Sequence, residues 1–433
     1  MSTDFILIVL YAMPLLLFLA YYLRRQKKSE QAHGEAWQEA KEAGLTEPPS
    51  LHPVVDPRRC LGSRACVTVC PEKAIGIIGG KAQLINPAHC IGHGACKTAC
   101  PHDAIQLVFG TAKRGIDIPQ VNPNFETNVP GIFIAGELGG MGLIRKTAEQ
   151  GRQAMEHIAK RTQGSFPYDV VIVGAGPAGI AASLGAMEKK LKFATVEQEE
   201  SFGGTVYHYP RNKVVMTAPV QLPIVGKMNF GEVSKEKLLG FWQNVARDTG
   251  LKINAQERVT RIAVVDGGFV VTSTRTTYRA RSVLLAIGRR GTPRKLGVPG
   301  EESHKVVYRL TDPEQYRGQH VLVVGGGDSA LEAAAGLAEV PGTVVTLSYR
   351  SSAFARAKTK NRKRVEDAET SGRLQVLLSS EVKSVHAARV DLVHRGAPLS
   401  IRNDAVIVCA GGILPTDFLK SIGIRIETKH GTA

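Results

Sequence analysis

The sequence predicts an α/β protein with two Rossmann-like nucleotide-binding domains. The first observation is the run from Tyr168 to Glu197, in which a β-branched strand is followed by glycines spaced G-x-G-x-x-G and then by a helical stretch. The second is the run from His320 to Ala330, H-V-L-V-V-G-G-G-D-S-A, which repeats that order. Glycines at these points let the backbone approach a pyrophosphate at a helix N-terminus. We therefore expect a bound dinucleotide at each loop.

Composition limits the classes of partner. The 433 residues suffice for two or three domains, and the net charge of +16 favours an acidic protein or an anionic surface. The sequence contains no nucleic-acid-binding module and no basic run interleaved with aromatic residues, so we exclude nucleic acid. Six of the seven cysteines fall within residues 60–100, which indicates a metal centre and not a disulfide framework.

An uncharged apolar run from Phe5 to Leu23 opens the chain. As a helix it would extend roughly 28 Å, about the thickness of a bilayer core. Basic residues follow from Arg24, so the positive-inside rule places everything after them in the cytoplasm. We expect a transmembrane anchor over residues 1–25, a stalk or linker over 26–52, and a single-pass protein of the bacterial inner membrane whose catalytic domains face the cytoplasm.

Residues 54–108 contain an internal repeat with a period of 30. In it, D-P-R-R-C-L-G-S-R-A-C-V-T-V-C-P-E-K-A-I aligns with N-P-A-H-C-I-G-H-G-A-C-K-T-A-C-P-H-D-A-I. The repeat resembles the bacterial two-cluster ferredoxins, whose motif is C-x-x-C-x-x-C-x-x-x-C-P. The second cysteine of each motif is replaced here, by Ser63 and by His93. The resemblance implies a small α+β ferredoxin domain over residues 53–112 with two iron–sulfur clusters.

The resemblance also implies how the ligands divide, because in that family the fourth cysteine of each motif serves the other cluster. The two ligand sets are then Cys60, Cys66, Cys100 and Ser63 for one cluster, and Cys90, Cys96, Cys70 and His93 for the other. Either Ser63 and His93 bind the fourth iron of 4Fe–4S clusters, or that iron is lost and 3Fe–4S centres remain. A neutral imidazole in place of a thiolate removes negative charge and should raise that cluster's potential, so we expect the two clusters to be inequivalent. A ferredoxin fold without metal is one alternative, and zinc, which fits this spacing poorly, is another.

Residues 116–160 resemble the C-terminal segment of thioredoxin-reductase-like flavoproteins, through I-P-Q-V-N-P-N-F-E-T-N-V-P-G-I-F-I-A-G-E. In that family the segment follows both nucleotide-binding domains, and its final acid binds the flavin ribityl chain. Here Gly136 and Glu137 fill that end, and the segment precedes the first glycine loop. The simplest account is a circular permutation, which nearby termini make easy. A helix from Met141 to Arg161 should follow.

The same resemblance makes the first loop an FAD site. Glu197 stands 23 residues after Gly174, at the position where a carboxylate accepts hydrogen bonds from ribose hydroxyls. The stretch S-F-G-G-T-V-Y-H-Y-P would lie along the pyrophosphate and ribityl chain, and S-V-L-L-A-I-G resembles the crossover to the inserted domain. The expected FAD-binding residues are Gly174, Gly176, Pro177, Ala178, Gly179, Glu197, Gly203, Gly204, Thr205, Gly288, Gly136 and Glu137.

The second loop is expected to bind NADPH in preference to NADH. Val344 to Leu347 reads as the strand after its helix, and Tyr349-Arg350 closes it where an acid would hold the NAD ribose. An arginine there favours a 2′-phosphate. The expected residues are Gly325, Gly327, Asp328, Ser329, Ala330, Arg350 and Arg356.

The thiols of the thioredoxin-reductase-like family are missing. Its members carry C-x-x-C before the second glycine loop, where this chain reads Y-R-L-T-D-P-E-Q-Y-R-G-Q, and the bacillithiol-disulfide-reductase-like branch has a cysteine where Ala178 stands. Cys409 lies in an apolar strand and reads as a core residue. The sequence therefore predicts a membrane-anchored, FAD-dependent NAD(P)H oxidoreductase that passes electrons between NAD(P)H, FAD and two iron–sulfur clusters to a protein or membrane partner. A disulfide or low-molecular-weight thiol reductase and an iron–sulfur redox sensor without turnover are the alternatives.

The remaining domain boundaries follow from these assignments. We expect an FAD-domain segment over 113–163, the FAD-binding domain over 164–288, the NAD(P)-binding domain over 289–404 and a return to the FAD domain over 405–433. The protein partner should be an acidic electron-transfer protein, and a homodimer is left open. The sequence identifies no catalytic acid or base.

Overall fold

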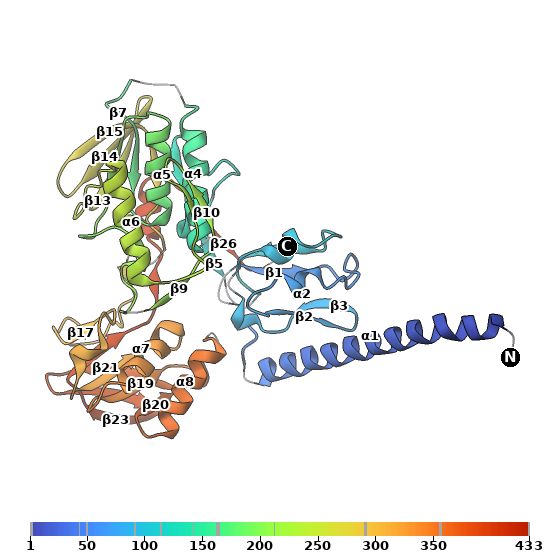
Figure 1. Cartoon of the computed structure of the whole chain (residues 1–433). Helices are drawn as coiled ribbons and strands as arrows, with labels where there is room; N and C mark the ends of the chain where they lie inside the picture. The colour runs from blue at the N-terminus through green and yellow to red at the C-terminus, as the bar shows by residue number, and fades with distance from the viewer. Residues whose placement is uncertain are drawn as a thin grey trace. The chain divides into compact units, whose positions relative to one another are not determined.

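The computed structural model describes residues 3–42, 44–48, 51–90, 92–112, 115–140, 142–161, 165–211, 213–289, 292–354 and 357–431. The chain divides into two compact units (Figure 1). One unit contains the N-terminal helix and the cysteine module, by which we mean residues 51–112. The other contains the two nucleotide domains.

A single helix, α1 (Thr3–Glu42), forms the N-terminal region, so the expected anchor and stalk are one continuous element. The apolar run therefore continues without a break into a charged second half. Within the described residues, no helix combines the length and the apolar character needed to cross a membrane. The predicted transmembrane helix over residues 1–25 is therefore wrong. The single-pass, cytoplasm-facing placement in the bacterial inner membrane is wrong with it, and the structure gives the predicted membrane partner no support.

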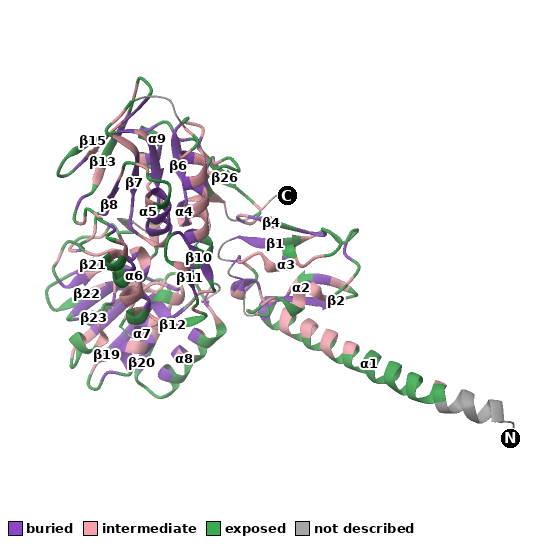
Figure 2. Cartoon of the chain, turned by 45° about the horizontal axis from the view of Figure 1, so that its top comes forward, coloured by how far each residue is buried: buried purple, intermediate pink, exposed green. Residues whose placement is uncertain are grey.

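The second half of α1 packs against the cysteine module, and Figure 2 colours part of this half as intermediate, whereas residues 11–25 are almost all exposed. The backbone N–H of Ile77 donates to His33 Nδ1 at 3.1 Å. The N–H of Gly80 donates to Glu30 Oε1 at 3.0 Å. The region predicted to be a helical or flexible stalk is thus a helix held by the module that follows it.

The cysteine module repeats its structure as it repeats its sequence. β1 pairs with β4 and β2 pairs with β3, both antiparallel. The helices α2 and α3 begin one residue before Cys66 and Cys96, respectively. The elements are β1 (His52–Val55), α2 (Ala65–Thr68), β2 (Ile75–Ile78), β3 (Lys81–Leu84), η1 (Pro87–His89), α3 (Ala95–Thr98) and β4 (Ile105–Val108).

The first nucleotide domain is organised around a mixed sheet in the order β13-β14-β15-β7-β8. The long strand β15 pairs along its first half with β14 and along its second half with β6, which runs parallel to it. The sheet strands are β6 (Ile132–Ile134), β7 (Tyr168–Val173), β8 (Phe193–Val196), β13 (Val259–Val265), β14 (Gly268–Ser273) and β15 (Thr277–Leu285). The segment that precedes the glycine loop in sequence therefore completes the sheet that carries it.

Within this sheet the strands β6, β7 and β8 are buried on both faces, which explains why they read as continuous apolar runs (Figure 2). Alternate residues of β7 enter different cores: Val170 and Ile172 pack under α4 (Ile144–Ile158) and α5 (Pro177–Glu188), while Val171 and Val173 face the opposite core. The helix expected over Met141 to Arg161 is α4, shorter at both ends; Met141 lies outside the described residues.

Smaller elements complete the first domain. β5 pairs antiparallel with β26, which joins the start of this domain to the end of the chain. These smaller elements are β5 (Ile116–Pro119), η2 (Glu137–Gly139), η3 (Gly204–Val206), β9 (Val214–Met216), β10 (Val220–Leu222), β11 (Gly226–Met228), β12 (Glu232–Ser234), α6 (Lys235–Thr249), α9 (Thr416–Ser421) and β26 (Ile426–Lys429). The crossovers to the second domain pair with each other as β16 (Thr292–Pro293) and β25 (Gly412–Ile413).

The second nucleotide domain contains a parallel sheet in the order β17-β24-β18-β19-β20. A separate antiparallel sheet, β21-β22-β23, follows β20 along the chain. Because β24 pairs with β17 and β18, residues 405–408 belong to this sheet, and the chain returns to the first domain after them. The elements are β17 (Val306–Val307), η4 (Pro313–Tyr316), β18 (His320–Val324), α7 (Asp328–Ala338), β19 (Val344–Tyr349), α8 (Thr359–Thr370), β20 (Leu374–Leu378), β21 (Ser380–Val385), β22 (Arg389–His394), β23 (Ala397–Arg402) and β24 (Ala405–Val408).

Candidate functional site

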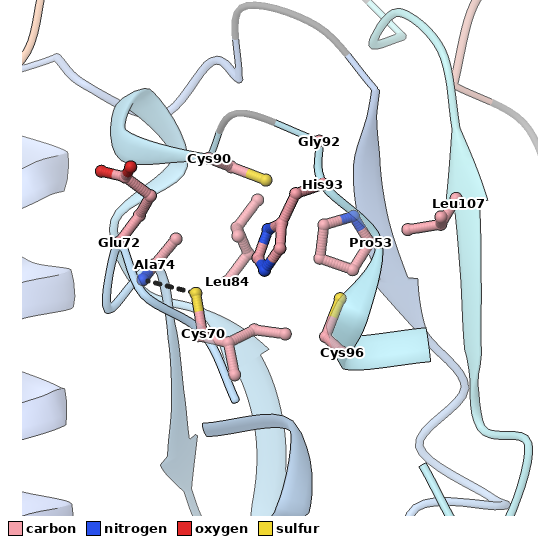
Figure 3. Close-up of a pocket in the computed structure, with 12 residues that line it drawn as sticks. Pro53, Cys70, Glu72, Ala74, Leu84, Cys90, Gly92, His93, Cys96 and Leu107 are labelled. Carbon is pink, nitrogen blue, oxygen red and sulfur yellow. Dashed lines mark hydrogen bonds between the residues drawn. The ribbon is translucent and has the colours of Figure 1, made fainter. Parts of the chain in front are cut away.

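The cysteine module contains a pocket, which we call the Cys90 cavity, with about 320 Å³ of empty space, part of it open to solvent. Figure 3 shows the His93 ring among three thiols that come from both halves of the repeat. The thiols and imidazole that line it are Cys70, Cys90, Cys96 and His93, which is the second ligand set expected from the sequence. Cys90 and Cys96 are buried.

A second cavity of about 300 Å³, the Cys60 cavity, is lined by the other expected set: Cys60, Cys66, Cys100 and Ser63. The structure thus brings the eight predicted residues together in two groups of four. Among the described residues, no three His, Cys, Asp or Glu side chains converge as ligands of one metal ion. The thiols surround open space instead, and the donor set of three sulfurs with space between them suits an iron–sulfur cluster.

Two glycines fix the loops that carry the variant corners. Gly62 has φ +69°, and a Cβ there would lie 2.3 Å from the Gly80 carbonyl oxygen. Gly92 has φ +73°, and its Cβ would lie 2.5 Å from the Leu51 carbonyl oxygen. Only glycine avoids these clashes. Ser63 and His93 therefore follow equivalent tight turns.

Backbone N–H groups point at several of the sulfurs. Ala82 donates to Cys60 Sγ at 3.3 Å, and Ala74 and Ala104 donate to the sulfurs of Cys70 and Cys100 at 3.4 and 3.3 Å. Such bonds stabilise thiolates and are one of the factors that set a cluster's potential. Burial, and to a smaller extent the charges of neighbouring thiols, raise the pKa of Cys66 to about 11. Burial also raises the pKa of Cys90 to about 11. The metal must therefore supply the charge that holds these ligands as thiolates.

The first glycine loop follows β7 directly and is a close-packed cradle. A Cβ on Gly179 would lie 1.8 Å from the Gly174 carbonyl oxygen, and one on Gly204 would lie 2.9 Å from the Gly176 Cα. The Gly203–Gly204 loop is thereby held over the glycine loop, and Gly203 N–H donates to the Ala175 carbonyl at 2.9 Å. Residues Gly174, Gly176, Pro177, Ala178, Gly179, Gly203, Gly204 and Thr205 thus form one surface, and its backbone fits a dinucleotide pyrophosphate.

Glu197 lies at the end of β8 and is buried. Its carboxylate accepts from the N–H of Ala175 at 2.6 Å and from that of Glu199 at 3.1 Å. Burial raises the pKa of Glu197, and those backbone donors oppose the rise. The side chain thus tethers the glycine loop to the next strand. It lies close to where the hydroxyls of a bound ribose would form hydrogen bonds.

Gly136 and Glu137, from the segment before the first loop, reach the same place. A Cβ on Gly136 would lie 3.1 Å from the Ala178 Cβ, and one on Gly288 would lie 3.9 Å from Glu137 Oε2. Sequence reasoning missed Arg289, whose pKa burial lowers while the nearby Glu137 opposes that shift. It also missed Gly151 of α4, which no motif singled out.

The second glycine loop joins β18 to α7. Gly325 packs against the Cys409 carbonyl, where a Cβ would lie 2.5 Å from the oxygen. Gly326 lies under the Tyr349 ring, and a Cβ added to Gly326 would lie 2.3 Å from the nearest ring atoms. Gly327 has no neighbour within 4 Å of a Cβ and faces open space at the start of α7. That opening leaves a position for a pyrophosphate beside Asp328, Ser329 and Ala330.

Arg350 directly follows β19, the strand whose end holds Tyr349. It is therefore at the sheet edge where a 2′-phosphate is expected. Arg356, the other predicted contact to that phosphate, lies outside the described residues.

Comparison with known proteins agrees with the description of the nucleotide domains and with that of the cysteine module. Residues 171–432 match the family model described as pyridine nucleotide-disulphide oxidoreductase. Residues 52–101 match a model described as a 4Fe-4S dicluster domain.

Individual relatives match the nucleotide domains. A ferredoxin–NADP reductase of Thermus thermophilus is 31% identical over 271 residues, which are 60% of this chain and 77% of the relative. One of Ignicoccus hospitalis is 28% identical over 271 residues, 60% of this chain and 83% of the relative. A bacillithiol disulfide reductase of Staphylococcus aureus shares the fold at a TM-score of 0.54 and 24% identity, over 60% of this chain and 80% of that one.

Proposed function

Because the chain belongs to the pyridine nucleotide-disulphide oxidoreductase family and carries a 4Fe-4S dicluster domain, we propose that it moves electrons between NADPH and its own two iron–sulfur clusters by way of FAD, and exchanges them with an acidic electron-transfer protein. Flavin supplies the conversion between a hydride pair and single electrons. The rest of the proposal concerns what the residues of this chain bind and exclude.

The distribution of thiols carries this proposal. The cysteine module contains six of the seven cysteines, and all of them line the two cavities. The seventh, Cys409, directly follows β24 and has no cysteine near it in the sequence. Burial, and to a smaller extent the charge of Glu332, raise its pKa to about 12. A disulfide-exchanging enzyme needs a reactive thiolate, commonly one of a pair. Cys409 has neither property, so the one-electron route is favoured over thiol reduction.

The nucleotide domains support the donor side of the proposal. Each has the strand, glycine loop and helix that hold a pyrophosphate, and Arg350 favours NADPH. Relatives named ferredoxin–NADP reductase support the same class of exchange. The net charge of +16 favours an acidic partner, since complementary charge accelerates association.

The test is anaerobic purification of the full chain with flavin, iron and sulfide quantitation, followed by NADPH titration. Visible absorbance would follow the flavin, and EPR spectra before and after NADPH would follow the clusters. The proposal predicts one flavin, two clusters and new EPR signals as NADPH is consumed. Flavin bleaching with unchanged cluster spectra would contradict it, and so would protein that holds FAD without iron.

A further inference from the structure

The two cysteine cavities differ at the corner where the ferredoxin motif has a fourth cysteine. His93 lines the Cys90 cavity, and its Nε2 is buried without a hydrogen-bond partner among the described residues (Figure 3). Ser63 lines the Cys60 cavity but is exposed to solvent. One corner is thus a shielded nitrogen and the other is a hydroxyl in water.

A buried polar nitrogen without a partner is costly and rare in folded proteins. Its position facing three thiols suggests that its partner is the group those thiols hold. Neutral imidazole is a competent ligand of cluster iron, as histidine-ligated clusters demonstrate. A serine hydroxyl is a harder donor, has to lose a proton to bind as an anion, and at an exposed site competes with water.

We propose that the Cys90 cavity holds a four-iron cluster ligated by Cys70, Cys90, Cys96 and His93, and that the cluster in the Cys60 cavity has three thiolate ligands and one exchangeable iron at the exposed corner beside Ser63. The inference rests on the proposed function only in that both cavities hold clusters. It assigns different roles to the two corners that the repeat makes equivalent.

Two consequences follow from this asymmetry. A neutral imidazole carries one negative charge less than a thiolate, so His93→Cys should lower the reduction potential of the cluster in the Cys90 cavity. The exposed corner of the other cluster should release iron on mild oxidation. In that step the cluster gives one electron to ferricyanide, which becomes ferrocyanide, and one ferrous ion leaves, so that a three-iron cluster remains.

The experiment uses the full chain, purified anaerobically and reconstituted with iron and sulfide. Wild type is compared with His93→Ala, His93→Cys, Ser63→Ala and Ser63→Cys. Each protein is assayed for iron and sulfide, then by EPR after one equivalent of ferricyanide. Electron–nuclear double resonance on protein grown with isotopically labelled histidine and reduced with dithionite, which makes four-iron clusters paramagnetic, reports whether a histidine nitrogen is bound to a cluster.

We expect labelled-histidine coupling in wild type, and its loss in both His93 variants. His93→Ala should lose iron, and His93→Cys should retain it, which separates ligand loss from misfolding. Ferricyanide should produce a three-iron EPR signal in wild type, Ser63→Ala and His93→Cys. Ser63→Cys should abolish that signal because it restores the fourth thiolate.

Absence of histidine coupling in cluster-loaded wild type would overturn the assignment of His93. Iron loss in Ser63→Ala, or a three-iron signal that persists in Ser63→Cys, would overturn the assignment of the exposed corner. None of these measurements uses NADPH, so they can succeed even if the clusters prove not to accept electrons from NADPH, and the two proposals fail separately.

Discussion

Gly151 of α4 and Ala178 of α5 meet backbone to backbone, so that a Cβ on Gly151 would lie 2.0 Å from the Ala178 carbonyl oxygen. α5 is the helix that opens on the first glycine loop, and α4 follows the segment that contributes Gly136 and Glu137. The contact therefore fixes the segment placed before the loop against the helix at which we expect the pyrophosphate to bind.

Substituting Gly151 by alanine should push α4 away from α5. We expect a loss of about 2 kcal/mol in the free energy of unfolding, the usual cost of overpacking, together with weaker retention of FAD. Thermal unfolding and flavin content after gel filtration measure both. Gly240→Ala is the matched control, since it lies inside α6 with nothing within 4 Å of a Cβ and should gain about 0.5 to 1 kcal/mol. Equal effects of the two substitutions would show that the helix contact is unimportant.

Glu197→Gln should weaken FAD binding. The carboxylate accepts from the N–H groups of Ala175 and Glu199 through different oxygens, whereas an amide would turn its NH₂ toward one of those donors. Losing a buried acceptor costs about 1 to 3 kcal/mol, so the dissociation constant for FAD should rise roughly tenfold. Fluorescence titration of flavin-free protein would measure it. Glu188→Gln, on an exposed position at the end of α5, should bind FAD as wild type does.

Gly326→Ala should displace the Tyr349 ring from the second glycine loop and raise the KM for NADPH roughly tenfold, with FAD content unchanged. Steady-state NADPH oxidation with a dye acceptor measures this. Gly336→Ala, inside α7, is the control. A Cβ there would meet only Pro313, at an ordinary contact distance of 3.8 Å, so the KM for NADPH should not change. An unchanged KM in Gly326→Ala would mean that the tyrosine is not part of the nucleotide site.

Gly327→Ala should act differently from Gly326→Ala, because a Cβ at Gly327 meets nothing in the protein. Its stability should stay within about 0.5 kcal/mol of wild type. Its affinity for NADPH should still fall, since the methyl group would occupy the approach to the pyrophosphate. Calorimetric titration with NADP⁺, paired with thermal unfolding, separates the two effects. Binding as tight as in wild type would place the pyrophosphate elsewhere.

Cys409→Ala should leave NADPH oxidation and cluster reduction unchanged, and wild-type Cys409 should resist alkylation at neutral pH, because burial raises its pKa to about 12. The raised pKa also sets a pH dependence. The unfolded thiol ionises near its ordinary value of 9.0 while the folded one stays protonated, so its contribution to stability is complete below that pH and is lost as the pH rises toward about 12. Wild type should therefore lose more stability than Cys409→Ala across that alkaline range. Loss of activity in Cys409→Ala would instead support a thiol reductase.

Much of the nucleotide sites could be predicted from sequence because their signals are local. The strand before Gly174, the glycine spacing and Glu197 are fixed by turn geometry and by the length of one helix and one strand, so short-range patterns suffice. The division of the cysteines into two sets was implied by the resemblance of the repeat to the two-cluster ferredoxins. The N-terminal run shows the limit of a local window, since its apolar stretch predicted an anchor whereas the structure has one long helix with a charged half that packs on the cysteine module.

By itself, the sequence determined which residue types are expected to meet a pyrophosphate or a cluster, because those expectations depend on backbone conformation and donor chemistry within a few residues. Only the tertiary structure decided which distant backbones touch, as at Gly151 and Ala178 or at Gly326 and Tyr349. It alone distinguished His93, with a shielded and unpartnered nitrogen, from the exposed Ser63. Burial and close contact depend on how separate segments pack, and no spacing within one segment encodes that.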